Sequence, residues 1–368
     1  MTADEKQAFL DYYNAHLEFP GKLIRGTPQN YVGAVMALSG TFYFREGWTR
    51  NKREAICRCL TRYLEVVQDH ILWLVAEDSP IEPYISPYSK VKPLTDVYSK
   101  IDEDYSVIRT YKGGKTANDA SPYCFHIGTH ARWEEARDEK YNKDYMDVLR
   151  FSLPVRIIQE KPVLFQKLFL KFAQELQAFH GFGGLRLELP PDSTDDDPTE
   201  AWLAQQSNGI VAGDDFLSTS YLNPLKLKSI SWLTVLGNDL LSHYDNLILR
   251  QELPPSWYAV YNYDHGTVIQ AGNLPDAAQF PLHSHPATYV LINMLMKPFR
   301  TDYCTIHVNS LATPLITGKQ SVALWLSRFD VPDEQLIEYK HKLTQMPVLK
   351  KKHVLYDAVD PHFQHLYR

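Results

Sequence analysis

Histidines are the residues of this sequence whose type and spacing come closest to a metal site. His126 and His130 are four residues apart, a spacing that places both on one face of a strand. His283 and His285 flank one serine between two prolines, and a third ligand for this second pair is not evident, because no HExxH motif or cysteine lies nearby. We interpret the first pair as ordinary surface or hydrogen-bonded histidines and the second pair as part of a loop. A metal-dependent enzyme that uses them is the alternative.

The densest acidic run is PPDSTDDDP at residues 190–198. A Mg²⁺ site needs carboxylates that the surrounding structure fixes, and a loop bounded by prolines does not supply this by itself. A solvated linker is the simplest interpretation. The other is an anionic surface for a basic partner, to which Asp214 and Asp215 would add. The sequence contains no GxSxG, Walker, Rossmann or kinase signature, so we predict no catalytic residue, no cofactor and no metal.

Charge and hydropathy narrow the class of protein further. The 368 residues are 44% hydrophobic and 22% charged, which is ordinary for a globular protein. The net charge of −6 argues against direct binding to a nucleic-acid backbone and is compatible with a basic partner. The polar start predicts no secretory signal, and no apolar run is long enough to predict a transmembrane helix. Four cysteines without a CxxC pair complete the prediction of a cytoplasmic protein.

Two kinds of apolar periodicity predict the elements that would position these residues. Alternating or continuous apolar residues predict strands, at residues 31–44, 71–75, 123–129, 148–159 and 185–189. Helical stripes predict helices at residues 50–68, with Lys52 and Arg53 on the solvent side, and from Pro162 to Phe179. We predict an α+β fold with a mixed or antiparallel sheet, helices packed on one face, and a first half of the split β-α-β type.

Prolines and glycines mark the predicted breaks. Residues 80–119 are rich in Pro, Ser, Tyr and Gly, and we interpret them as loop. The GFGG run at residues 181–184 is interpreted as the stop of the preceding helix. The acidic run divides the chain into a first part, 1–190, and a second part, 191–368, which could pack as one unit.

A hairpin is predicted in the second part, where alternating aromatic residues at 257–263 and apolar residues at 267–271 flank DHG. We expect Gly266 to supply the positive φ of the turn. Tyr258, Val260 and Val268 are the expected inward-facing positions of a hairpin with one buried face.

Several phrases, in order, resemble a bacterial family. They are HGFGGL at residues 180–185, LKSISWLTVLG at 227–237, IQAGNLP at 269–275, and Leu295, Pro298 and Arg300. The family was first catalogued as a domain of unknown function and is associated with type VI secretion immunity proteins. One departure is HYDN at residues 243–246, where members close a helix with two glycines. The shared residues that we expect to be structural are Trp232, Leu233, Gly237, Ala271, Gly272 and Pro275.

The resemblance implies an immunity protein that binds a co-encoded antibacterial effector in the cytoplasm and blocks it. Effectors paired with this family resemble nucleases with restriction-endonuclease-type or VRR-type domains. Acidic side chains could then replace DNA phosphates at the nuclease. We predict that six carboxylates contribute to this contact, namely Asp192, Asp195, Asp196, Asp197, Asp214 and Asp215. A scaffold that loads the effector without inhibiting it is a further alternative.

Overall fold

The computed structural model describes residues 18–24, 28–77, 82–134, 145–191, 194–243, 252–279, 285–307 and 315–355. The described strands form one sheet of 11 members, in the order β10-β11-β9-β8-β2-β7-β6-β5-β3-β4, with β1 paired to β2. The strands are β1 Glu18–Gly21, β2 Gln29–Phe44, β3 Trp73–Glu77, β4 Ile85–Pro87, β5 Val107–Lys112, β6 Cys124–Thr129, β7 Asp147–Pro154, β8 His180–Glu188, β9 Leu233–Gly237, β10 Tyr258–Tyr263 and β11 Gly266–Ala271.

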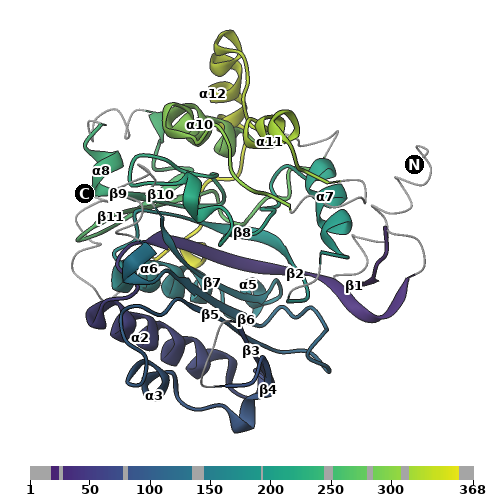
Figure 1. The fold of residues 1–368 in the computed structure, drawn as a ribbon. Helices are drawn as coiled ribbons and strands as arrows, with labels where there is room; N and C mark the ends of the chain where they lie inside the picture. Colours follow the sequence, from purple (N-terminus) through teal and green to yellow (C-terminus); the bar gives the residue numbers. More distant parts are fainter. Residues whose placement is uncertain are drawn as a thin grey trace.

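Helices cover both sides of this sheet (Figure 1). They are α2 Arg50–Val67, α3 Leu94–Tyr98, α5 Ile157–Glu160, α6 Leu164–Leu176, α7 Asp197–Gln206, α8 Asn238–Leu241, α10 Ala287–Met296, α11 Lys319–Leu326 and α12 Leu336–Thr344. In Figure 1, α2, α3 and α6 lie on one side of β2, and α10, α11 and α12 lie on the other. The predicted α+β class is confirmed. Among the described helices, none is long and apolar enough to span a bilayer.

The central strand β2 explains the split β-α-β arrangement. It pairs antiparallel with both β7 and β8, so these two strands run parallel to each other with β2 between them. Helix α6 connects β7 to β8 across β2, and α2 connects β2 to β3 across three intervening strands. Both crossovers place their helices on the same face, where Arg58 of α2 pairs with Glu175 of α6 at 2.8 Å. The predicted "mixed" character is absent from the described strand pairs, which are all antiparallel.

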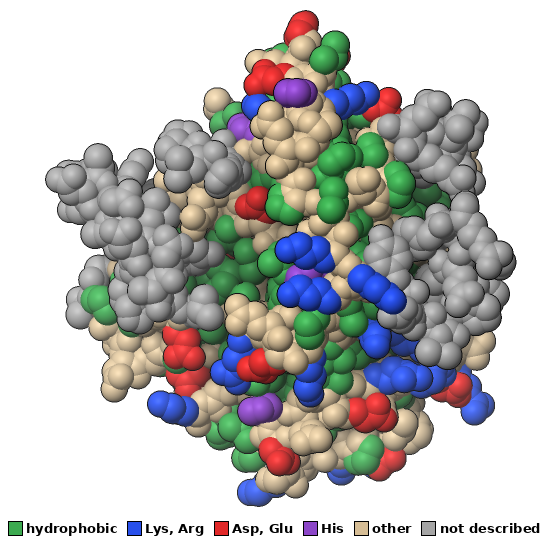
Figure 2. Space-filling view, turned by 180° about the vertical axis from the view of Figure 1, so that it is seen from behind, with side chains coloured by type: hydrophobic (Ala, Val, Ile, Leu, Met, Phe, Trp, Pro, Cys, Tyr) green, Lys and Arg blue, Asp and Glu red, His purple; other side chains and the backbone are tan. Residues whose placement is uncertain are grey.

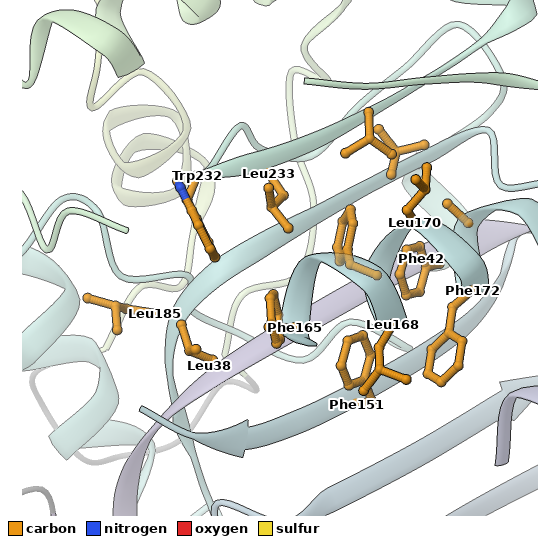
Figure 3. Packing of buried hydrophobic residues seen from close by; sticks show 14 of the residues in the cluster. Leu38, Phe42, Phe151, Phe165, Leu168, Leu170, Phe172, Leu185, Trp232 and Leu233 are labelled. Carbon is orange, nitrogen blue, oxygen red and sulfur yellow. The ribbon is translucent and has the colours of Figure 1, made fainter. Parts of the chain in front are cut away.

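Aromatic side chains fill the space between α6 and the sheet (Figure 3). The ring of Phe42 on β2 lies 4.6 Å from that of Phe169 on α6, measured between centroids. Phe151 on β7 packs in the same way on Phe165, at 5.1 Å. Because successive strand residues point to opposite faces, this packing leaves the other face of β2 free for its polar residues.

Trp232 extends this core to the far strands. Its indole is fully buried, and its ring lies 6.1 Å from that of Phe165. The indole Nε1–H donates to the carbonyl of Gly272 at 3.1 Å, which joins two of the shared sequence phrases directly. Gly272 has a φ of +79°, a conformation that favours glycine. Leu233 and Ala271 are buried beside them, whereas Pro275 is half-buried.

The glycines at residues 181–184 lie inside β8, so their interpretation as a helix stop is wrong. Helix α6 ends instead at Gln177, which adopts the left-handed conformation with a φ of +52°. A Cβ on Gly183 would lie 2.7 Å from the ring of Phe169, and one on Gly181 would lie 2.6 Å from the carbonyl of Thr41. These glycines therefore allow close packing against the sheet. Gly237 similarly leaves room for the backbone of Phe179, 2.9 Å from its would-be Cβ.

Two basic residues of α2 are buried, contrary to the prediction that they face solvent. The Lys52 ammonium donates to the carbonyl of Leu176 at 2.8 Å, at the open C-terminal end of α6. Arg53 donates to the carbonyls of Ile101 and Asp102 at 3.0 and 2.6 Å. Unpaired carbonyls at helix ends and in turns are good acceptors for buried cations. The apolar periodicity of a helix does not show that such carbonyls lie nearby in the fold.

The predicted hairpin exists, but three details differ. Strand β11 is buried throughout, so the hairpin does not have one exposed face. Val268 lies opposite Tyr261 and therefore shares its face, whereas Tyr258 and Val260 point to the other face. Gly266 belongs to β11 and is not among the residues with positive φ. Its role is close approach, because a Cβ there would lie 2.4 Å from the carbonyl of Leu236.

Residues 80–119 were predicted as loop, yet they contain β4, α3 and β5. Strand β5 pairs with both β3 and β6. The predicted boundary near residue 190 falls between β8 and α7, and β9 of the second part pairs directly with β8 of the first. One sheet thus runs through both parts.

Candidate functional site

Four neighbouring strands bring polar side chains together on the sheet face opposite α6. Thr110 lies opposite His126, His126 lies opposite Arg150, and Arg150 lies opposite Thr41. Directly opposed residues point to the same face, so the four form a row across β5, β6, β7 and β2. The other charged groups of the site pack against this row.

Asp215 is the centre of the charged cluster that packs against this row. It is 1% exposed, and its Oδ2 lies 2.6 Å from the guanidinium of Arg186. Its Oδ1 accepts from the ammonium of Lys228 at 3.0 Å, and Thr41 donates to Oδ2 at 2.9 Å. Arg150 lies slightly farther away, at 3.7 Å.

The surroundings keep Asp215 ionised. Burial alone would raise the pKa of this carboxyl, but Arg186, Lys228 and Arg150 together hold the pKa well below its usual range. A buried charge of this kind is stable only while its partners remain, because the desolvation of each ion is costly. The cluster therefore fixes residue 215 and its loop firmly onto the sheet.

A cavity of about 360 Å³ lies beside the cluster, and we name it the sheet cavity. Glu188 and Arg150 form part of its lining and approach each other at 3.4 Å. Glu188 is 2% exposed, and its Oε1 has no hydrogen-bond partner; the same is true of the Nε of Arg150. The ionisable lining groups are carboxylates (Glu77, Glu188, Asp197, Glu200 and Asp214), cations (Lys112, Arg150 and Arg186), imidazoles (His126 and His307) and the thiol of Cys124.

Glu200 and His307 form a second buried pair at the cavity wall. The Nε2 of His307 lies 3.0 Å from the Oε2 of Glu200, which also accepts from the backbone N–H of Gly213 at 2.9 Å. The N–H of Ile316 donates to Nδ1 of His307, so Nε2 carries a proton and donates to Glu200. Burial raises the pKa of Glu200, but the hydrogen bonds from His307 and Gly213 and the charge of Arg186 lower it overall.

The carboxylates of the acidic run at residues 190–198 have different surroundings. Asp196 is buried, and it accepts from the backbone N–H of Lys22 at 2.7 Å and from the hydroxyl of Tyr31 at 2.9 Å. Asp195 is half-buried and pairs with the Lys22 ammonium at 2.9 Å. These two carboxylates hold β1 against the start of α7.

The remaining predicted carboxylates differ in exposure. Asp197 is 9% exposed and Asp214 is exposed, and both line the sheet cavity. Asp215 is buried in the charged cluster described above, and Asp192 lies outside the described residues. The structure thus brings Asp197, Asp214 and Asp215 to one site, and of these Asp214 is the one open to solvent.

The described members of the predicted histidine pairs do not meet as metal ligands. The Nδ1 of His126 lies 2.9 Å from the hydroxyl of Thr110, and burial lowers the pKa of His126 to about 3. His130 stacks on the ring of Phe216 at 5.0 Å. His285 is half-buried, and His283 lies outside the described residues. In the described part of the chain, no group of three or more His, Cys, Asp and Glu side chains could hold a metal ion.

Fold and site together define an α+β protein with a preformed polar cavity on one face of a large antiparallel sheet. The Pseudomonas aeruginosa T6SS protein PA0821 has a similar structure, with a TM-score of 0.88 and 31% sequence identity over 96% of this chain and 99% of that one. The family model described as type VI immunity for VRR-NUC, TsiV, matches residues 55–329. A comparison with curated proteins gives no match. The chain belongs to this family of type VI immunity proteins.

Proposed function

We propose that this chain binds a co-encoded type VI effector with a VRR-NUC nuclease domain in the cytoplasm and inhibits it without catalysing a reaction. The observation that carries the proposal is the family match over residues 55–329, which spans strands β3 to β11 and the residues that line the sheet cavity. The proposed inhibition requires binding alone. This role is consistent with the buried ion pairs of Asp215, which make the scaffold rigid before the partner arrives.

The contact is proposed at the mouth of the sheet cavity. A nuclease presents basic side chains where it holds DNA, and carboxylates that replace the phosphates would compete for them. Asp214 is exposed at the mouth, with Asp197 and Glu188 deeper in the cavity. Asp196 and Asp215 bind other parts of the same chain, so we remove them from the six carboxylates that the sequence predicted for the contact.

One face of the molecule carries a cluster of basic side chains (Figure 2). Lys and Arg side chains gather over the middle of that face, around a histidine, and acidic side chains are scattered around them. A basic face of this kind would repel a basic DNA-binding groove. The negative net charge of the chain is therefore not spread evenly over its surface.

Co-expression tests the proposed function. The effector encoded beside this chain is expressed in a bacterial host with and without the chain, and the two proteins are then co-purified. Relief of toxicity together with a stable complex is the expected result. A complex without relief would favour the effector-loading scaffold, and neither relief nor complex would contradict the proposal.

A further inference from the structure

The sheet cavity contains a buried carboxylate with an unused acceptor. Glu188 is 2% exposed, and its Oε2 approaches Arg150 at 3.4 Å, but its Oε1 has no partner. A carboxylate removed from water keeps its charge at a cost unless donors satisfy both oxygens. The free oxygen of Glu188 therefore points to a donor that binds in the cavity.

The charges around the cavity favour a cationic donor. Five carboxylates line it against three Lys and Arg side chains, and one of these three, Arg186, is neutralised by Asp215 behind the wall. Lys112 donates to the carbonyls of Ala117 and Asp119, and burial lowers its pKa to about 8. The pKa of His126, about 3, leaves that imidazole neutral. An anion would meet more carboxylates than free cations here.

The size and access of the cavity suit a long side chain. Its volume of about 360 Å³ lies at the lower end of the range for small-ligand pockets, roughly 300–1,000 Å³. Asp214 and Thr194 are exposed members of the lining, so the cavity can be reached from solvent. A guanidinium carries several donors in a planar fork, and this fork matches the two oxygens of a carboxylate at the wall of the sheet cavity.

We infer that the sheet cavity receives an arginine or lysine side chain of the effector, whose cationic group donates to Oε1 of Glu188. This inference rests on the proposed function and adds the chemistry of the contact to it. Asp214 at the mouth steers the side chain inward, and Glu188 binds it at depth. Buried charge pairs at the centre of an interface contribute far more than pairs at its exposed rim.

The test compares Glu188→Gln with a matched control in the purified complex. Glu65→Gln makes the same chemical change at an exposed position of α2, on the opposite face of the sheet. We expect Glu188→Gln to weaken effector binding by at least about tenfold, because one partner of a buried charge pair is lost, and Glu65→Gln to leave the affinity unchanged. Asp214→Asn, which keeps the oxygen that accepts from Leu217, should reduce the association rate without disturbing the fold.

A double-mutant cycle identifies the partner side chain. Each exposed Arg and Lys of the effector's nuclease domain is changed to Ala, and one of these changes should lose its effect when Glu188 is already Gln. If Glu188→Gln binds the effector as tightly as the wild-type chain does, this inference is overturned and the proposed function stays intact. If wild-type chain and effector form no complex, both fail.

A free solute is the competing occupant. N-acetyl-arginine methylamide is added to the chain alone, and its effect on the melting temperature is measured for wild type and Glu188→Gln. Stabilisation that requires Glu188, combined with an unchanged effector affinity in Glu188→Gln, would assign the cavity to a small cation and overturn the effector contact.

Discussion

At the scale of single residues, the sheet cavity and the charged cluster beside it depend on charged side chains of β7 and β8 that point away from α6. Arg150 on β7 and Arg186 and Glu188 on β8 alternate with apolar residues that face α6. That alternation is visible in the sequence and could have marked the three as neighbours. Their burial could not be predicted, because the segments that cover them, including Asp215 and Lys228, come from distant parts of the chain.

Asp215→Asn tests the cluster. The substitution removes the charge that compensates Arg186 and Lys228 in the interior, and we expect it to lower the free energy of unfolding by about 3–5 kcal/mol. Urea denaturation followed by circular dichroism measures the loss. The neighbouring exposed Asp214→Asn serves as the control, with an expected change within about 0.5 kcal/mol. Equal stability of the two variants would show that the cluster does not stabilise the fold.

The buried histidines predict a dependence of stability on pH. Burial lowers the pKa of both His126 and His180 to about 3 in the folded state, whereas an unfolded histidine titrates near 6.5. Between these values the unfolded chain binds more protons, so folding loses stability as the pH falls. The loss should approach about 1.4 kcal/mol per pH unit for each histidine below about pH 6.

Unfolding measured between pH 7 and about pH 4.5 checks this dependence, since carboxylates with unfolded pKa values near 4 contribute mainly below that window. His126→Gln should remove the share of the slope that belongs to His126. A slope that is the same in wild type and variant would contradict the assignment.

At the scale of elements, apolar periodicity predicted those helices and strands whose formation the local sequence determines. The apolar stripes of α2 and α6 and the alternation of β2 indicated elements that the structure contains with nearly the same bounds. Strand β5 was missed because Pro and Gly in its flanks dominated the composition of residues 80–119. The glycines of β8 were misread because they allow close contacts with other elements, Gly183 with Phe169 of α6 and Gly181 with the Thr41 carbonyl of β2, and such contacts depend on tertiary packing.

Gly183→Ala tests that packing. The added methyl would lie 2.7 Å from the Phe169 ring, and overpacking of this kind costs about 1–3 kcal/mol of unfolding free energy. In a Phe169→Leu background the same substitution should cost less, because the smaller side chain leaves room. Thermal or urea unfolding of the four variants measures the difference. A cost that is independent of residue 169 would contradict the close contact as its cause.

At the scale of the whole molecule, one antiparallel sheet supports both a packed helical face and a polar face with a cavity. The shared family residues Trp232 and Gly272 join strands and loops within the sheet and its core, and they do not line the cavity. Resemblance to the family therefore predicted the role of the chain more directly than it predicted the contact residues. Narrowing the proposed contact to particular carboxylates required the burial of each of them.

Long-range charge should govern how fast the proposed complex forms. Raising the salt concentration from about 0.05 to 0.5 M shortens the Debye length severalfold, so the association rate with the effector should fall while dissociation changes less. Asp214→Lys should lower the rate at low salt and flatten its salt dependence, because a cation would replace the exposed carboxylate at the cavity mouth. Stopped-flow or surface-based kinetics measure both. An association rate indifferent to salt and to Asp214 would contradict approach through this mouth.

Inhibition of the nuclease itself is the most direct measurement of the central claim. Purified effector is incubated with plasmid DNA and increasing amounts of this chain, and the cleaved fraction is measured on a gel. The account predicts that cleavage falls to the background level once the chain saturates the effector, and that Glu188→Gln shifts the titration to higher concentrations. Full cleavage in the presence of saturating chain would contradict an immunity function.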